Sequence, residues 1–224
     1  MLDLCTGTGC IALLLHSLLV PHFKRLRILG IDKSPKALEL AQTNIEHNRR
    51  SGVLDSRAST DIQFHRADVL KEGEVEALLS RYFSVADESD STTLESRCDL
   101  LISNPPYISN SDFRNGTTAR SVRLFEPREA LVPPTFHSLS SKLDKPEDIF
   151  YHRILDLSFQ TKAKVTVLEC GDIKQAKRVI EMYNTMLSKP TERNAEIWPS
   201  SQTDLAAYGF HFRDGSRSVI IQSS

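Results

Sequence analysis

The sequence predicts an α/β protein with a doubly wound, mostly parallel sheet of seven strands and an antiparallel pair at its C-terminal edge. Three observations support this fold class. Short apolar runs alternate with amphipathic helical patterns along most of the chain. A glycine-rich turn follows the first apolar run, and polar side chains follow the next three. Finally, strand patterns at 195–198 and 218–222 lie close together in sequence, as expected of an antiparallel edge pair.

The composition indicates one globular domain over residues 1–224, with 40% hydrophobic and 25% charged residues. The formal net charge of −1 provides no general attraction for nucleic acid, so we expect no stable nucleic-acid binding. The four cysteines have neither CxxC spacing nor a zinc-type histidine partner, and we expect reduced core cysteines and no metal. No apolar run approaches the ~18 residues of a membrane span. We therefore expect no membrane association, and we expect a monomer.

Residues 1–20 predict a strand, a tight loop and a helix. The loop consists of Cys5, Thr6, Gly7, Thr8 and Gly9. The two glycines allow a tight turn and close backbone approach to a ligand, and the helix N-terminus behind them favours a negative group or a lone pair. The run 11–15 is apolar on nearly every side, which predicts a buried helix. A dinucleotide fingerprint and a plain glycine turn fit the same spacing.

Carboxylates follow the second and third predicted strands. The strand 26–31 ends at Asp32, a position where a carboxylate can bind a ribose diol. Ser34 and Pro35 predict the N-cap and first position of the next helix, so Asp32 is not needed for that purpose. Asp68 and Val69 follow the strand at 62–64, where they could contact an adenine amino group and ring. A solvated turn aspartate is the alternative for Asp68.

The buried strand 99–103 is followed by Asn104, Pro105, Pro106 and Tyr107. The prolines fix φ and have no N–H, so nearby carbonyls are preset acceptors. The Asn104 side-chain oxygen adds another acceptor, and Tyr107 offers a flat face for stacking. This arrangement suits a planar –NH2 group whose two N–H bonds are both accepted. An ordinary proline-rich turn is the structural alternative.

The remaining patterns complete the alternation of strands and helices. Helices are expected at 75–82, 150–157 and 172–183, the last capped by Asp172, and a strand at 164–170. Residues 84–97 form a polar, acidic stretch that predicts an insertion loop. Residues 108–148 are expected to form a long irregular loop that carries arginines. The loop is either a lid facing the substrate or a solvated segment.

Four stretches together resemble class I S-adenosylmethionine-dependent methyltransferases with a Rossmann-like sheet. More narrowly, they resemble the HemK/PrmC-type enzymes, which methylate the side-chain amide nitrogen of a glutamine in the Gly-Gly-Gln loop of peptide chain release factors. The stretches are residues 3–9, 30–32, 103–108 and 122–131. Asn-Pro-Pro-Tyr is shared with adenine-N6 methyltransferases, whereas the Phe-Glu-Pro segment at 125–127 points to the glutamine enzymes.

The resemblance implies a role for each site residue. S-adenosylmethionine would be bound by Asp3, Cys5, Thr6, Gly7, Thr8, Gly9, Asp32, Asp68, Val69 and Asn104. Asn104 and the Pro105 carbonyl would hold the glutamine amide, with Pro106 and Tyr107 completing the substrate contacts. The catalytic set is then Asn104, Pro105 and Tyr107. A release factor is the implied protein partner, and a mitochondrial location is implied first, with the cytoplasm as the alternative.

The chain departs from the family pattern at four points. Cys5 stands where the family often has glycine, and Val69 replaces a frequent aromatic residue. The insertion at 84–97 is longer than usual, and we expect the N-terminal helical domain that helps to dock the release factor to be missing from this sequence. Because the sequence opens inside a predicted strand, we expect upstream sequence to be missing.

Other functions fit parts of the same pattern. An adenine-N6 methyltransferase acting on DNA or RNA would use the same grip on an exocyclic amino group, but the near-neutral charge argues against it. A non-catalytic fragment that binds S-adenosylmethionine is a second alternative. A nicotinamide enzyme is the weakest, because it has no use for Asn-Pro-Pro-Tyr.

Overall fold

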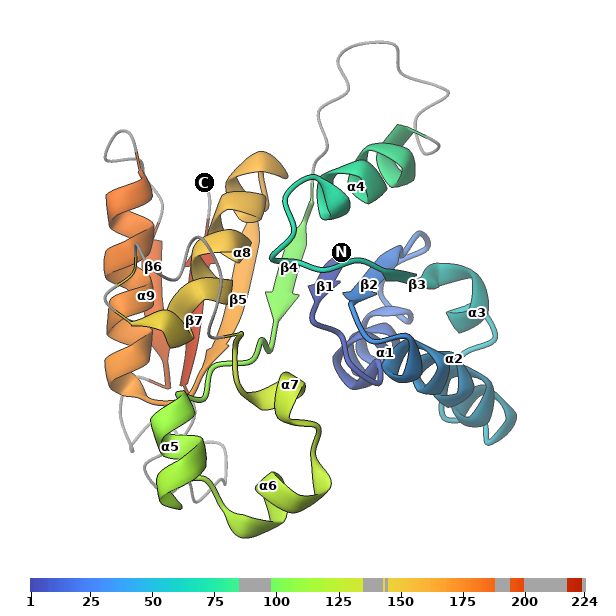
Figure 1. Ribbon diagram of the computed structural model, residues 1–224. Helices are drawn as coiled ribbons and strands as arrows, with labels where there is room; N and C mark the ends of the chain where they lie inside the picture. Colours follow the sequence, from blue (N-terminus) through green and yellow to red (C-terminus); the bar gives the residue numbers. More distant parts are fainter. Residues whose placement is uncertain (85–97, 135–142, 144, 188–193, 200–216, 223–224) are drawn as a thin grey trace. The chain divides into compact units, whose positions relative to one another are not determined.

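The strand order is β3-β2-β1-β4-β5-β7-β6, which confirms the predicted seven-stranded, mostly parallel sheet. The structure is a computed structural model that describes residues 1–84, 98–134, 143, 145–187, 194–199 and 217–222 (Figure 1). Contacts within the chain divide it into two units. The first comprises Met1–Ser103 with Phe159–Ala163, and the second Asn104–Ser158 with Lys164–Ser224.

The first unit contains four parallel strands, listed here in chain order: β1 (Leu2–Leu4), β2 (Ile28–Asp32), β3 (Ile62–Arg66) and β4 (Leu100–Ser103). β1 lies between β2 and β4, and its last residue, Leu4, is in register with Ile31 on one side and Ser103 on the other. β2 also pairs in parallel with β3. The three loops that follow β1, β2 and β3 therefore leave the sheet at the same edge.

Four helices belong to this unit: α1 (Cys10–Leu19), α2 (Pro35–Arg50), α3 (Ala58–Asp61) and α4 (Glu74–Ser84). The first three pack against β2 and β3 (Figure 1). α2 begins as predicted, because the Ser34 side chain accepts a hydrogen bond from the Ala37 N–H and Pro35 is the first helical residue. α3 was not predicted, since four residues are too few to show a helical period.

The prediction that α1 is buried on every side is wrong. Ala12, Leu13 and His16 are its buried residues, whereas Leu14 and Leu18 are 58% and 56% exposed. An apolar run cannot distinguish the side of the helix that faces the sheet from the side that faces outward. The buried His16 ring bonds to the Asp61 carboxylate at 3.2 Å, so this histidine is a structural core residue.

The second unit contains β5 (Val165–Cys170), β6 (Asn194–Trp198) and β7 (Arg217–Gln222). β7 pairs antiparallel with both of the others, which confirms the predicted antiparallel pair. Helix α9 (Ile173–Met186) packs against these strands, and α8 (Ile149–Gln160) follows the short 3-10 helix Pro146–Asp148 (Figure 1). The Asp172 side chain caps α9 as predicted, accepting from the Gln175 N–H.

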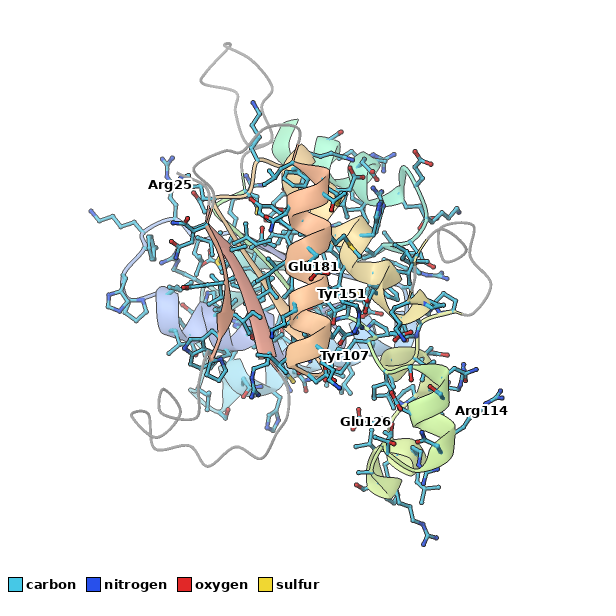
Figure 2. All side chains as sticks on the ribbon, turned by 90° about the vertical axis from the view of Figure 1, so that its left-hand side faces the viewer. Arg25, Tyr107, Arg114, Glu126, Tyr151 and Glu181 are labelled. Carbon is cyan, nitrogen blue, oxygen red and sulfur yellow. The ribbon has the colours of Figure 1, made fainter. Side chains whose placement is uncertain are left out.

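The stretch after β4 is not irregular as predicted, because it contains three short helices. These are α5 (Asn110–Asn115), α6 (Arg120–Phe125) and α7 (Arg128–Leu131). Figure 2 shows Arg114 and Glu126 on this segment. Each helix is too short for a hydrophobic period to appear in the sequence. Residues 135–142 and 144 lie outside the described residues, as do residues 85–97 of the predicted insertion at 84–97.

The described part of the chain contains no helix long and apolar enough to cross a membrane. All four cysteines are free. Cys98 and Cys170 are buried as expected, but Cys10 is exposed and Cys5 only partly buried, so two of the four are not core residues.

Candidate functional site

Backbone hydrogen bonds fix the glycine-rich loop between β1 and α1. The Thr6 N–H donates to the Ile31 carbonyl of β2 at 3.0 Å, and the Gly9 N–H donates to the Thr6 carbonyl at 3.0 Å. From α2, the Asn44 amide donates to the Thr8 carbonyl at 3.0 Å. Gly9 then enters the helix with φ 80°, a left-handed conformation that favours glycine. The loop is therefore held on both sides by the first unit's own elements.

The glycines of this region serve two different purposes. A Cβ on Gly9 would lie 2.7 Å from the Phe64 ring, and one on Gly30 would lie 2.5 Å from it. Those two glycines make room for Phe64. Gly7, at φ 56°, has nothing within 4 Å of the position that a Cβ would take. The backbone at Gly7 is thus open to close approach by a ligand. Cys5 also adopts positive φ, at 58°, where the resembling family often has glycine.

Asp3 is a buried carboxylate directly beneath the loop. Its Oδ2 accepts the Thr6 hydroxyl at 2.6 Å, whereas its Oδ1 is buried without a hydrogen-bond partner among the described residues. Burial raises the pKa of Asp3 to about 7, with a smaller contribution from the Asp32 charge and against the lowering effects of the Thr6 hydroxyl and the Ala12 backbone N–H. A buried oxygen without a donor is suited to a ligand that brings a positive charge or an N–H group.

Asp32 connects the glycine loop to the start of α2. Its Oδ2 accepts the Gly7 N–H at 2.9 Å, and its Oδ1 accepts the Ser34 N–H at 2.8 Å. Each carboxylate oxygen can accept a second hydrogen bond, so both retain capacity for a ligand. This bracing role is not visible in the sequence, and it makes Asp32 a support of the loop in addition to a candidate ribose ligand.

Asp68 and Val69 lie in the loop after β3. The Ala67 N–H donates to the Asp32 carbonyl at 3.1 Å, which ties this loop to the end of β2. Asp68 Oδ1 accepts the Leu70 N–H at 2.9 Å, so the side chain closes its own turn. Val69 is only 3% exposed and offers little surface to an adenine ring. The ligand roles of this pair stay predictions.

Asn104 to Tyr107 follow β4 directly. The Ser103 hydroxyl donates to the Leu4 carbonyl at 2.7 Å, which fixes the end of the strand. Asn104 is exposed, and its side chain makes no hydrogen bond among the described residues, while Pro105 and Pro106 are buried. Asn104 thus lies between the fixed end of β4 and two buried prolines, and the polar atoms of its amide are available to a ligand.

Tyr107 is held firmly within the second unit. Its hydroxyl donates to Glu169 Oε1 at 3.2 Å, and its carbonyl accepts from Gln175 Nε2 at 3.3 Å. Its ring lies over Gly171, where a Cβ would be 3.0 Å from the ring. Figure 2 shows Tyr107 near one end of α9. One face of the ring is therefore occupied by the protein itself.

The residues that hold Tyr107 were not predicted from the sequence. The set comprises Asp148, Tyr151, Glu169, Gln175 and Arg178. Gln175 did carry a signal, because Asp172-x-x-Gln175 has the spacing of a capping box. The other members come from separate elements, and only the fold brings them together.

The chain has a Rossmann-like methyltransferase fold. The catalytic domain of human Mettl16, solved in complex with an RNA hairpin from the MAT2A 3′UTR, superposes with a TM-score of 0.56 at 15% identity, covering 99% of this chain and 62% of that one. The N-terminal domain of human METTL16 in complex with SAH gives a TM-score of 0.52 at 15% identity, covering 99% and 60%. At this identity the likeness concerns the fold alone. No protein-family model matches the chain.

At the level of sequence, the chain is homologous to release factor glutamine methyltransferases. It is 40% identical over 134 residues to the probable MRF1 mitochondrial N(5)-glutamine methyltransferase mtq1 of Schizosaccharomyces pombe, covering 59% of this chain and 35% of that protein. It is 35% identical over 135 residues to the release factor glutamine methyltransferase of Chlorobaculum tepidum, covering 60% and 36%. The mitochondrial MRF1 N(5)-glutamine methyltransferase MTQ1 of Saccharomyces cerevisiae is 33% identical over 137 residues, covering 58% and 32%. The match spans about a third of the length of these relatives.

Proposed function

We propose that residues 1–224 are one methyltransferase domain that transfers a methyl group from S-adenosylmethionine to the side-chain nitrogen of a glutamine in a peptide chain release factor. One observation carries the proposal. Asn104-Pro105-Pro106-Tyr107 follows β4, whose last residue is in register with the end of β1, where the glycine loop begins. The names of the homologous proteins support glutamine as the acceptor and a release factor as the partner.

The first unit fits S-adenosylmethionine on its own features. The unpartnered Asp3 Oδ1 suits a cationic ligand, and the open backbone at Gly7 permits close approach. Asp32 has lone pairs left for a ribose diol, and Asp68 stands in the neighbouring loop. When bound, this cofactor supplies an electrophilic methyl group on a sulfonium.

A carboxamide nitrogen is a poor nucleophile, and hydrogen-bond acceptors at residues 104 and 105 would raise its reactivity. The lone pair of a carboxamide nitrogen is delocalised, so its reactivity depends on orientation and on polarisation of its N–H bonds. We assign the Asn104 side-chain oxygen and the Pro105 carbonyl as acceptors of those two N–H bonds. Such positioning contributes up to about 7–11 kcal/mol to a reaction barrier in favourable cases. Asn104 has no basic group, so its role is to orient the nucleophile.

Transfer of labelled methyl from S-adenosylmethionine to a release factor tests the proposal directly. We expect label on the wild-type factor and none on a factor whose Gly-Gly-Gln glutamine is replaced by alanine. Label on DNA or RNA adenine, with none on the factor, would establish the nucleic-acid alternative. Tight S-adenosylmethionine binding without transfer to any acceptor would instead identify a non-catalytic binding module.

We also propose a mitochondrial site of action, because two of the homologous proteins are named as mitochondrial. Fractionation of cells that express the full-length protein should place it with the mitochondrial matrix. Recovery in the cytosol alone would contradict this location.

Replacing Asp32 should raise the Kd for the cofactor and have a smaller effect on the free energy of unfolding. In Asp32→Ala the ribose ligand and the brace on the Gly7 N–H are both lost, so we expect the Kd for S-adenosylmethionine to rise by about 10–100-fold. Isothermal titration calorimetry measures this change. Ser34→Ala is the matched control, since it removes only the helix cap and should cost about 1 kcal/mol of stability without changing the Kd. An unchanged Kd in Asp32→Ala would disprove the ribose assignment.

A further inference from the structure

Every polar atom of the Gln175 side chain has a partner within the second unit. Its Nε2 donates to the Tyr107 carbonyl at 3.3 Å and to Asp148 Oδ1 at 2.9 Å. Its Oε1 accepts the Gly171 N–H at 2.8 Å and lies 3.5 Å from the Tyr151 hydroxyl. The residue is 5% exposed. A buried amide bonded on all sides has one orientation, so it can define the place of the groups around it.

The Asp148 carboxylate anchors this amide. It is 3% exposed and receives two hydrogen bonds from the Arg178 guanidinium, Nε to Oδ2 at 2.6 Å and Nη2 to Oδ1 at 3.0 Å. Arg178 and Gln175 both belong to α9, so one helix carries the two side chains that donate hydrogen bonds to Asp148. Bidentate pairs of this kind are strong and directional.

The result is that Tyr107 is held at three points. Gln175 holds its carbonyl, Glu169 holds its hydroxyl, and Gly171 leaves just enough room for its ring. The following residue is also fixed, because the Ile108 N–H donates to the Leu131 carbonyl at 2.9 Å. Two hydrogen bonds and one close packing contact thus hold Tyr107, and of these the carbonyl contact acts directly on the main chain.

We propose that Gln175 is a positioning residue for the methyl-transfer step, and this inference rests on the proposed function. By fixing the Tyr107 carbonyl, Gln175 fixes the main chain that follows Pro105 and Pro106. The two proline rings allow little rotation, so the restraint reaches the Pro105 carbonyl and Asn104. Gln175 does not touch the acceptor; it determines where the groups that touch the acceptor stand.

Gln175→Glu is the most informative substitution, because it keeps the shape of the side chain and replaces its NH2 donor group by an oxygen. The ionised variant sets a carboxylate oxygen against both the Tyr107 carbonyl and Asp148. We expect kcat at pH 8 to fall by about 10–100-fold while the Kd for S-adenosylmethionine stays within about twofold, because the proposed cofactor residues other than Asn104 belong to the first unit. A protonated carboxyl has one O–H, which can donate to either the Tyr107 carbonyl or Asp148, so the ratio of variant to wild-type kcat should recover in part as pH falls. An unchanged kcat at pH 8 overturns the proposal.

A double variant separates positioning from simple stability. In Gln175→Glu/Asp148→Asn, the new amide at position 148 can donate to the new carboxylate, and one negative charge remains for Arg178. This restores the 148–175 pair but leaves the Tyr107 carbonyl without a donor. We expect the thermal midpoint to return toward the wild-type value while kcat stays low. If kcat recovers together with the midpoint, Gln175 acts only through stability and the inference fails.

Amide hydrogen exchange gives a readout that does not depend on the acceptor. Peptides covering residues 104–110 should exchange faster in Gln175→Glu than in the wild-type chain, while peptides from β1 to β3 should be unchanged. Unchanged exchange in 104–110 overturns the inference even if no methyl transfer is found. Faster exchange combined with a wild-type chain that labels no release factor rejects the proposed function and leaves the positioning of Tyr107 intact.

Discussion

Asn104→Ala should lower kcat for methyl transfer by at least about 10²–10³-fold while the Kd for S-adenosylmethionine rises by less than about threefold. Losing one preorganised hydrogen-bond partner at a reacting centre typically has an effect of this size. Asn104 is exposed and makes no hydrogen bond among the described residues, so the fold loses almost nothing when its amide is removed. Single-turnover measurement with labelled cofactor separates the chemical step from binding.

Ser103→Ala is a matched control for this substitution. Ser103 directly precedes Asn104, and the substitution removes its hydroxyl, which donates to the Leu4 carbonyl at 2.7 Å. The variant should lose about 1 kcal/mol of stability and retain kcat, because Ser103 supports the strand and does not touch the acceptor. If Asn104→Ala weakened cofactor binding and turnover equally, Asn104 would belong to the cofactor site alone, and the acceptor assignment would be withdrawn.

The parts of the fold that follow from local pattern could be predicted from the sequence. Parallel strands appeared as apolar runs, Ser34 with Pro35 marked the start of α2, and Asp172 marked the start of α9. The short helices α5 to α7 could not be found, because each is set by local turn geometry. The outward exposure of Leu14 and Leu18 could not be found either, since it depends on what lies against α1.

The candidate site also has residues that the sequence reveals and residues that it does not. Its proposed ligand residues occur at strand ends, and strand ends are visible in sequence. Its supports are not visible, because they join distant positions. The Gln175 amide meets the Tyr107 carbonyl 68 residues away, and Arg178 meets Asp148 30 residues away. Asp32 belongs to both groups. Its position at the end of β2 marked it in the sequence as a candidate ligand, whereas its bond to the Gly7 N–H is visible only in the structure.

Asp3 should lower the stability of the chain as the pH rises from about 4 to about 7. Burial raises the pKa of Asp3 to about 7 from 3.8, so between these values the folded state holds a proton that the unfolded state has released. Raising the pH therefore favours unfolding, and the effect is complete above about pH 7. A shift of this size corresponds to roughly 3–5 kcal/mol.

Asp3→Asn should remove most of this pH dependence. The amide resembles the protonated carboxyl in shape and still accepts the Thr6 hydroxyl, so near pH 4 the variant and the wild-type chain should have similar free energies of unfolding. At pH 8 the variant should be more stable by a few kcal/mol, as urea titration would measure. Parallel stability curves between pH 5 and pH 8 would show that Asp3 is already ionised in the folded state.

The same carboxylate connects stability to ligand binding. Asp3 Oδ1 is buried without a partner among the described residues, so the ionised form is unfavourable until something positive or a donor reaches it. Binding of S-adenosylmethionine, which carries positive charge, should lower the pKa of Asp3 and release up to about half a proton at pH 7. Calorimetric titration in two buffers of different ionisation enthalpy measures that proton. Its absence in wild-type protein, or its persistence in Asp3→Asn, would assign the unpartnered oxygen to the structure alone.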